Sequence, residues 1–262
     1  MVLTVENLSK NFKGLKAVNN LSMSLEEEEI VGIIGPNGAG KTTIFNLITG
    51  LLKPELKSKI TFLNENITLK PSYKIARKGI SRTFQKIKLF SHLTVLENVI
   101  IGAQKNNESG FLSTIFYGPK YRKNEQRIRE YAIHILELFH ISDLQNQIAG
   151  DLPYGTQRMV EISRAMASKP KLILLDEPVA GMNSEESISL SENIKDMKKK
   201  FKVTILLVEH DMSFVMGLCE RIIAVNYGVK IAEGKPEEIR NDQAVIEAYL
   251  GRQNVKDWTI RS

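Results

Sequence analysis

The chain has 262 residues, of which 42% are hydrophobic and 25% charged, which favours one large α/β domain or a core with a smaller subdomain and excludes disorder. The net charge of +6 does not indicate nucleic acid, because basic residues are scattered among nearly as many acids. The single Cys219 excludes an internal disulfide framework, and with four scattered histidines it forms no metal cluster. We expect no leader peptide, and no apolar stretch approaches the roughly 18 residues that span a bilayer, so a membrane role requires a partner.

The first predicted element is an antiparallel β-layer over residues 2–25, in which short runs of alternating apolar and polar residues are broken by Asn19-Asn20. The acidic run Glu26–Glu29 is expected to be an exposed turn. A strand over Ile30–Ile34 then leads into a glycine-rich loop and a helix. A further strand is predicted at residues 59–63.

The next part of the chain, which ends near Gly150, is predicted to be a helical insertion. Thr94 and Glu97 have the spacing of a capping box at a helix start. Residues 122–139 carry the apolar spacing of a helix. The stretch 106–120 combines glycine, proline and aromatic residues without periodicity, and we interpret it as a surface excursion of unassigned role.

The α/β core is predicted to resume with a helix over residues 156–168. Two uninterrupted apolar runs follow, at residues 172–175 and 203–208, and such runs between helices are typical of strands buried in a parallel sheet. Between them, Lys198-Lys199-Lys200 falls at the end of a predicted helix, where cations complement the helix dipole.

The most informative motif is the glycine-rich loop directly after the strand at residues 30–34. Its glycines let successive backbone N–H groups turn inward around an anion, and the following helix N-terminus adds partial positive charge. In such a loop Lys41 reaches the β- and γ-phosphates, and the Thr42 hydroxyl holds Mg²⁺. We therefore expect an ATP or other nucleoside-triphosphate site rather than an ordinary turn. Its predicted binding residues are Gly35, Asn37, Gly38, Ala39, Gly40, Lys41, Thr42 and Thr43.

A second predicted site lies where the apolar run at 172–175 ends in Asp176 and Glu177. Open α/β sheets place ligands at this edge. Asp176 can bind Mg²⁺ through water, and Glu177 can polarise the water that attacks the γ-phosphate. The alternative is an acidic pair that only begins a loop. Asn183 with Glu186 fits a capped helix start, so part of this segment is structural.

Four further motifs follow in order along the chain. They are Thr83-Phe84-Gln85, Leu152-Pro153-Tyr154-Gly155-Thr156-Gln157-Arg158, Ala180-Gly181-Met182-Asn183 and Val208-Glu209-His210-Asp211. With the phosphate loop and the acidic pair, they resemble the ATP-binding subunit of ABC transporters over nearly the whole chain. The resemblance implies an α/β P-loop NTPase core, a mostly parallel sheet with flanking helices, together with an N-terminal antiparallel β-layer and an inserted α-helical subdomain. It also implies a single ABC ATPase domain, divided into a core of residues 1–85 and 160–262 and a helical subdomain of residues 86–159.

The resemblance also implies roles for three residues outside the phosphate loop. Gln85 would touch Mg²⁺ or the lytic water and sense the membrane partner. His210 would bond the γ-phosphate and hold Glu177 in position, although a lone histidine after a buried strand is otherwise a satisfied core residue. Phe12 would stack on adenine, the alternative being simple packing.

The chain departs from the family in its signature, which is typically Leu-Ser-Gly-Gly-Gln and contacts ATP held by the opposite subunit of a head-to-tail dimer. Here Pro153, Tyr154 and Gly155 stand in those positions, and Pro153 has neither a hydroxyl nor an N–H group. Asn183 also replaces the usual aspartate. Both departures favour a heterodimer whose other ATPase subunit carries a regular signature.

Within the family, the chain resembles the ATP-binding subunits of high-affinity branched-chain amino-acid importers. The signature, the approach Ile80–Gln85, the loop near 111–120 and the two C-terminal segments at 236–240 and 248–251 carry this likeness. It implies permease subunits, a second ATPase subunit, a substrate-binding protein acting indirectly and a place at the cytoplasmic face of the membrane. Importers of urea or amides are a competing cargo class. Two competing functions are a regulatory nucleotide-binding module and a soluble ABC ATPase acting on ribosomes or DNA.

Overall fold

The computed structural model describes residues 1–104 and 119–250. The excursion expected around Phe111 lies outside these residues. The chain forms two compact units, which we call unit 1, Met1–Lys78 with Lys202–Ser262, and unit 2, Gly79–Phe201. The division expected from the sequence, at residues 85 and 160, remains a prediction.

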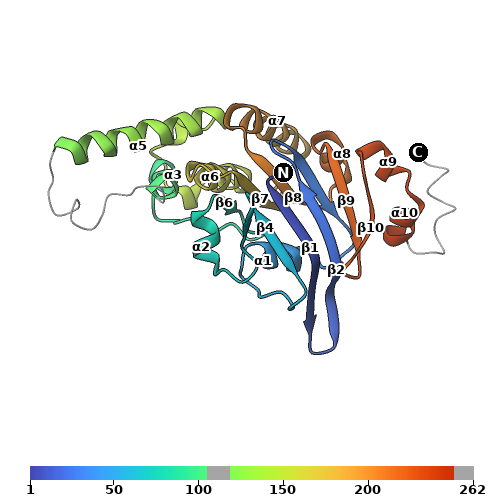
Figure 1. The fold of residues 1–262 in the computed structure, drawn as a ribbon. Helices are drawn as coiled ribbons and strands as arrows, with labels where there is room; N and C mark the ends of the chain where they lie inside the picture. The colour runs from blue at the N-terminus through green and yellow to red at the C-terminus, as the bar shows by residue number, and fades with distance from the viewer. Residues whose placement is uncertain (105–118, 251–262) are drawn as a thin grey trace. The chain divides into compact units, whose positions relative to one another are not determined.

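Unit 1 contains an antiparallel sheet in the order β2-β1-β4-β5. The long hairpin of β1 and β2 is drawn in blue in Figure 1 and extends past β4. One face of the hairpin is apolar and buried, as Leu8 and Leu21 show. The predicted antiparallel β-layer is therefore confirmed. The strands are β1 Leu3–Phe12, β2 Leu15–Leu25, β4 Lys59–Phe62 and β5 Glu65–Asn66.

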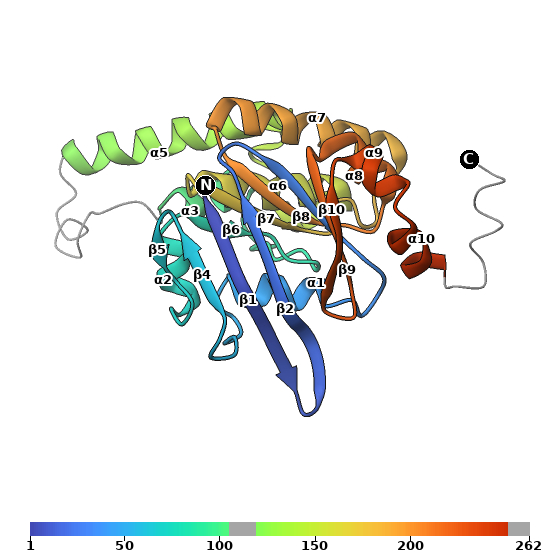
Figure 2. The same cartoon turned by 45° about the vertical axis from the view of Figure 1, so that its right-hand side comes forward.

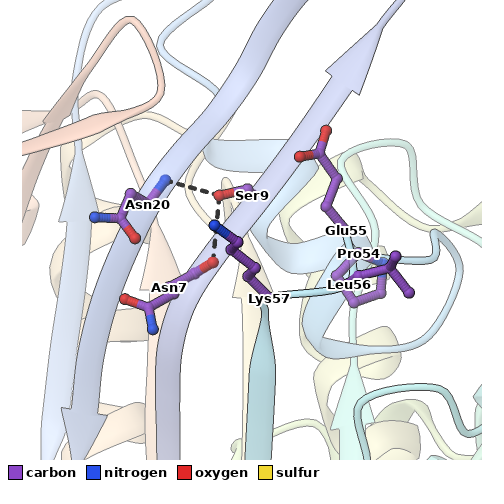
Figure 3. Close-up of a pocket in the computed structure, with 7 residues that line it drawn as sticks. All are labelled: Asn7, Ser9, Asn20, Pro54, Glu55, Leu56 and Lys57. Carbon is purple, nitrogen blue, oxygen red and sulfur yellow. Dashed lines mark hydrogen bonds between the residues drawn. The ribbon is translucent and has the colours of Figure 1, made fainter.

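The predicted break at Asn19-Asn20 is wrong, because β2 runs through it and the chain reverses at residues 13–14 instead. Asn7 and Asn20 both have φ of 53° and shift the register of the two strands as bulges. Their N–H groups donate to the hydroxyls of Ser22 and Ser9, at 2.9 Å each. Serine side chains thus replace the ladder bonds that the bulges remove. The bulges and the loop at 54–57 line a hollow of about 860 Å³ (Figure 3).

Unit 1 also contains the strands β10-β9-β3-β8, with β3 parallel to both β8 and β9 and β10 antiparallel to β9. All five residues of β3 and of β8 are buried, as the uninterrupted apolar runs predict. Figure 2 shows β10 beside β2. The bounds are β3 Ile30–Ile34, β8 Thr204–Val208, β9 Arg221–Asn226 and β10 Val229–Gly234, with helices α1 Lys41–Ile48, α2 Ser72–Arg77, α8 Met212–Leu218, α9 Pro236–Arg240 and α10 Gln243–Leu250.

The acidic turn before β3 is exposed at Glu26–Glu28, as expected. Glu29 differs, because its side chain is only 15% exposed and forms an ion pair with Arg221 of β9. The Arg221 Nε and Glu29 Oε1 atoms lie 2.7 Å apart, and a second bond of 2.8 Å joins the same two side chains. The two-point bond ties the turn to a neighbouring strand of unit 1.

Cys219 provides a test of the packing in unit 1. The thiol is buried against Gly32 of β3, where an added Cβ would lie 2.8 Å from Sγ. Burial, with help from Glu220 and Glu209, raises its pKa to about 12. Because the thiolate is the reactive form, we expect almost no labelling of native protein by a disulfide reagent at mildly alkaline pH. Labelling should become fast in denaturant, and fast labelling of the native protein would contradict the buried position.

Unit 2 begins with β6, Ile80–Arg82, which is parallel to β7, Leu172–Asp176. Its helices are α3 Val95–Gln104, α5 Pro119–Leu138, α6 Tyr154–Ala167 and α7 Ser184–Phe201, with short 3-10 turns η1 Ser142–Leu144 and η2 Ala149–Asp151. α3 packs against α5 and α6, and α6 also contacts β6 and β7. The helical subdomain and the strand at residues 172–175 are therefore confirmed, while α5 and α6 each begin two or three residues before their predicted starts.

The two capping boxes predicted in unit 2, at Thr94 and at Asn183, both form. The Thr94 N–H donates to Glu97 Oε2 at 2.8 Å, and the Glu97 N–H donates back to the Thr94 hydroxyl at 3.2 Å. The Thr94 N–H and the Thr94 hydroxyl both donate to the Glu97 carboxylate, and these two bonds lower its pKa. Asn183 and Glu186 exchange the same pair of bonds before α7, at 2.9 Å each. The three lysines at 198–200 occupy the last turn of α7.

The predicted fold class is confirmed: an α/β chain with an antiparallel β-layer, parallel strands with helices, and a helical subdomain. Among the helices in the described parts of the chain, none is both long and apolar enough to cross a bilayer.

Candidate functional site

The glycine-rich loop, which we call the P-loop, covers residues 35–43. It follows β3 and includes the first turn of α1. Gly40 caps α1 with φ of 100°, and a Cβ there would lie 2.3 Å from the Ala17 carbonyl oxygen. A Cβ at Gly35 would lie 2.1 Å from the Val225 carbonyl oxygen. Only glycine allows the loop to approach these two strands of unit 1 so closely. The spacing of glycines in the motif therefore has a direct structural cause.

The ligand-facing part of the P-loop is open. Asn37, Gly38 and Thr42 are exposed, and a Cβ added at Gly38 would meet nothing within 4 Å. Lys41 is only 7% exposed, and its ammonium group donates to the carbonyl oxygens of Gly35 and Pro36. The loop thus offers exposed backbone amides, a helix N-terminus and one cation at the same place, which suits a polyphosphate.

His210 lies at the end of β8 in the same unit. Its side chain is 59% exposed, whereas the preceding Glu209 is fully buried. The Glu209 carboxylate accepts the N–H groups of His210 and Asp211, at 2.9 and 3.3 Å. Asp211 in turn caps α8 by accepting the Phe214 N–H at 3.0 Å. The backbone is held firmly while the imidazole remains accessible. Its roles toward the γ-phosphate and Glu177 stay predictions.

Phe12 ends β1 and is 42% exposed, so its ring is not simply core packing. The Lys10 ammonium lies 5.4 Å from the ring centroid, within the range of a cation–π contact. An exposed phenyl face is what stacking on a base requires. The adenine contact nevertheless stays a prediction.

Unit 2 brings Gln85 and Glu177 together. The Gln85 Nε2 donates to Glu177 Oε2 at 2.9 Å. Glu177, directly after β7, has φ of 48°, in the left-handed region that side-chain-bearing residues seldom adopt. Its carboxylate is half-buried. The two residues that the sequence links to the lytic water are therefore in contact, and one of them sits on a strained backbone.

Asp176 has a partner that the sequence did not predict. The Arg82 guanidinium bonds its Oδ2 at 2.8 Å, and both side chains are nearly buried, at 7% and 3% exposure. The Asp176 N–H donates to the Thr83 hydroxyl at 3.2 Å. The carboxylate is thus oriented by Arg82 of β6, and the Asp176 backbone is tied to the segment that leads to Gln85.

The unusual signature forms the start of α6. Pro153 is the N-cap residue, and Tyr154 is the first helical residue. The Tyr154 ring lies over Gly181, where an added Cβ would be 3.3 Å from a ring carbon, and its hydroxyl accepts from Arg158 at 3.2 Å. A Cβ at Gly155 would lie 2.8 Å from a Glu186 carboxylate oxygen. Tyr154 and Gly155 are therefore packed against the segment after Glu177.

Arg158 is a functional candidate that sequence reasoning missed as an individual residue. It is fully buried, and it donates to the carbonyl oxygens of Phe84 and Gln85, at 2.6 and 2.8 Å, and to Glu161 at 2.7 Å. One guanidinium therefore joins the signature helix to the backbone of Gln85. Its position at the end of the signature motif is the only feature of the sequence that indicates this role.

Oxygen donors of the kind that Mg²⁺ prefers occur in each unit. In unit 1 the exposed Thr42 carries a hydroxyl at the start of α1, and in unit 2 Asp176 and Gln85 carry side-chain oxygens. That these residues hold one Mg²⁺ stays a prediction. In residues 1–104 and 119–250 no group of three or more His, Cys, Asp or Glu side chains could hold a metal ion alone. Mg²⁺ typically takes one or two protein ligands and completes its shell with water and phosphate.

A strand, a glycine-rich loop and a helix, with an acidic residue at a second strand end, define a P-loop nucleotide-binding protein. The model of the ABC transporter family matches residues 18–180. A second model, described as the branched-chain amino acid ATP-binding cassette transporter, matches residues 229–253. The chain belongs to the ABC transporter family, and it is an ATP-hydrolysing cassette.

Known relatives are similar over almost the whole chain. The high-affinity branched-chain amino acid transport ATP-binding protein BraF of Pseudomonas aeruginosa is 42% identical over 95% of this chain and 98% of its own. The corresponding protein LivG of Salmonella typhimurium is 44% identical over the same shares. A solved structure of the ADP conformation of an ABC transporter cassette has a TM-score of 0.82 and 35% identity, covering 96% of this chain and 99% of the other.

Proposed function

We propose that this chain powers the import of branched-chain amino acids, leucine, isoleucine or valine, by hydrolysing ATP. The observation that carries the proposal is the likeness, over 95% of the chain, to two ATP-binding proteins of branched-chain amino acid transport. The match of residues 229–253 to the branched-chain model supports the same cargo. The alternative is a urea, amide or other ABC transporter, because nothing in an ATPase subunit selects the cargo.

In this proposal the P-loop residues hold ATP as MgATP. Backbone N–H groups of the loop bind phosphate oxygens, and Lys41 neutralises the β- and γ-phosphates. Thr42, Asp176 and Gln85 would hold Mg²⁺, which when bound neutralises charge on the transferred phosphoryl group. Phe12 stacks on adenine. The exposure of Thr42 and of the Phe12 ring supports both assignments.

Glu177 is the proposed general base for the attacking water. Its bond from Gln85 and its left-handed backbone aim the carboxylate, which supports a positioned rather than a loosely solvated group. Gln85 orients the carboxylate or the water. His210 binds the γ-phosphate through an imidazole that is held at its backbone by Glu209.

The proposed active form is a head-to-tail dimer beneath permease subunits at the cytoplasmic face of the membrane, with a substrate-binding protein as the indirect partner. Pro153 supplies neither a hydroxyl nor an N–H donor. A signature with fewer donors favours a second, different ATPase subunit that provides a regular signature. A self-associating and fully active homodimer would argue against that part.

The proposal is tested by purifying the tagged chain with its membrane partners and reconstituting the complex in liposomes. We expect ATP-driven uptake of radiolabelled leucine, isoleucine or valine, no uptake of urea, and two distinct ATPase chains by mass spectrometry. Uptake of urea instead of leucine would overturn the proposed cargo. A complex that binds ATP but never hydrolyses it would favour a regulatory module.

A further inference from the structure

The P-loop is braced by residues close to the C-terminal end of the described chain. The Gly35 N–H donates to the Tyr249 hydroxyl of α10 at 2.8 Å. The Gly228 N–H, in the turn between β9 and β10, donates to the Ala39 carbonyl oxygen at 2.9 Å. All these residues belong to unit 1. The middle of the P-loop, at Ala39, thus bonds the turn after β9. Its first residue, Gly35, bonds a single side chain of α10.

Tyr249 is 36% exposed, and its hydroxyl is held by the P-loop. Its ring lines a pocket of about 530 Å³ with Met212 and Met216 of α8, Ile239 of α9 and Val245 of α10. Burial raises the pKa of its hydroxyl, so the group keeps its proton at physiological pH and remains a neutral acceptor. The ring therefore lies beside an apolar hollow, and the position of the hydroxyl is set by its bond from the P-loop.

The Gly35 N–H requires the Tyr249 hydroxyl as its hydrogen-bond acceptor. Gly35 is buried, has φ of 155° and lies close to the Val225 carbonyl oxygen of β9. A buried N–H without a partner costs free energy comparable to a lost hydrogen bond. Removal of the hydroxyl would therefore favour loop conformations in which the N–H reaches water, and these differ from the phosphate-binding conformation of the loop.

We propose that Tyr249 is a positioning residue for nucleotide binding, through which α10 holds the first turn of the P-loop in its phosphate-binding conformation. The inference rests on the proposed nucleotide site at Lys41 and Thr42. Tyr249 acts through Gly35 alone and touches no reacting atom, so its effect falls equally on the ground state and the transition state.

The test compares Tyr249→Phe, which keeps the ring and removes only the acceptor, with Tyr73→Phe, the same change at a 57% exposed tyrosine of α2 in the same unit. We expect Tyr249→Phe to raise the Kd for ADP and the KM for ATP about fivefold to twentyfold, because the N–H loses its partner. The kcat should stay within about twofold. Amide hydrogen exchange of the peptide containing Gly35 should accelerate in this variant, and Tyr73→Phe should change nothing.

Each outcome decides a separate point. A Tyr249→Phe protein with wild-type Kd, KM and exchange rate overturns the inference. A lower melting temperature with unchanged Kd also overturns it, since that result defines a purely structural role. A Lys41→Ala protein that still binds ADP like the wild type would instead overturn the proposed nucleotide site. Loss of binding in Lys41→Ala with normal binding in Tyr249→Phe would reject the positioning role alone.

Discussion

Replacement of Glu177 by glutamine is expected to reduce ATP turnover by about 100-fold to 10,000-fold, the range that a positioned general base contributes. Glutamine is nearly isosteric, and its amide can still meet the Gln85 side chain that bonds Glu177 at 2.9 Å. The neutral amide has no negative charge and cannot take up the proton. The measurement is steady-state phosphate release at saturating ATP, together with ATP affinity, which should change little.

Glu185→Gln is the matched control, since Glu185 is an exposed carboxylate in the first turn of α7 in the same unit. Its turnover should equal that of the wild type. Light scattering of Glu177→Gln with ATP then reports whether blocked hydrolysis traps a dimer of identical chains. Turnover by Glu177→Gln near the wild-type rate would rule out Glu177 as the base.

Replacement of Arg158 by methionine is expected to destabilise unit 2 by about 3–5 kcal/mol, the usual effect of removing one partner of a buried ion pair. Glu161 would remain as a buried carboxylate, 1% exposed. The carbonyl oxygens of Phe84 and Gln85 would also lose their donor. Urea unfolding followed by circular dichroism measures the shift.

The double variant Arg158→Met with Glu161→Leu should recover part of that stability, because a buried pair replaced by apolar side chains is often neutral. The backbone groups that Arg158 and Glu161 bond in the wild type still lack their partners, so recovery is incomplete. Arg129→Met, at an exposed position of α5, is the matched control and should have little effect. A loss in Arg158→Met no larger than in Arg129→Met would contradict the structural role of the buried guanidinium.

Features that depend on neighbours in the sequence were predictable. The P-loop follows from glycine spacing after a buried strand, and both capping boxes follow from partners three residues apart. The acidic pair after β7 follows from the end of an apolar run. In each case the interacting groups are close along the chain, so the local pattern contains the physical cause.

The parts that sequence reasoning missed depend on partners far apart in the chain. Arg82 meets Asp176, and Arg158 meets the backbone of Gln85, only because β6, β7 and α6 pack together. A local pattern cannot identify such pairs. The misplaced break at Asn19-Asn20 has the same origin, since the hydroxyl of Ser9 on the opposite strand keeps β2 continuous.

The left-handed backbone of Glu177 has a consequence for engineering this protein. A side chain at that φ costs of the order of 1–3 kcal/mol, and glycine would relieve the cost. A library selected only for heat resistance would therefore favour glycine there and discard the carboxylate. Thermostable variants of this chain should be screened for ATP turnover in the same round. At this position, selection for thermal stability opposes selection for catalysis.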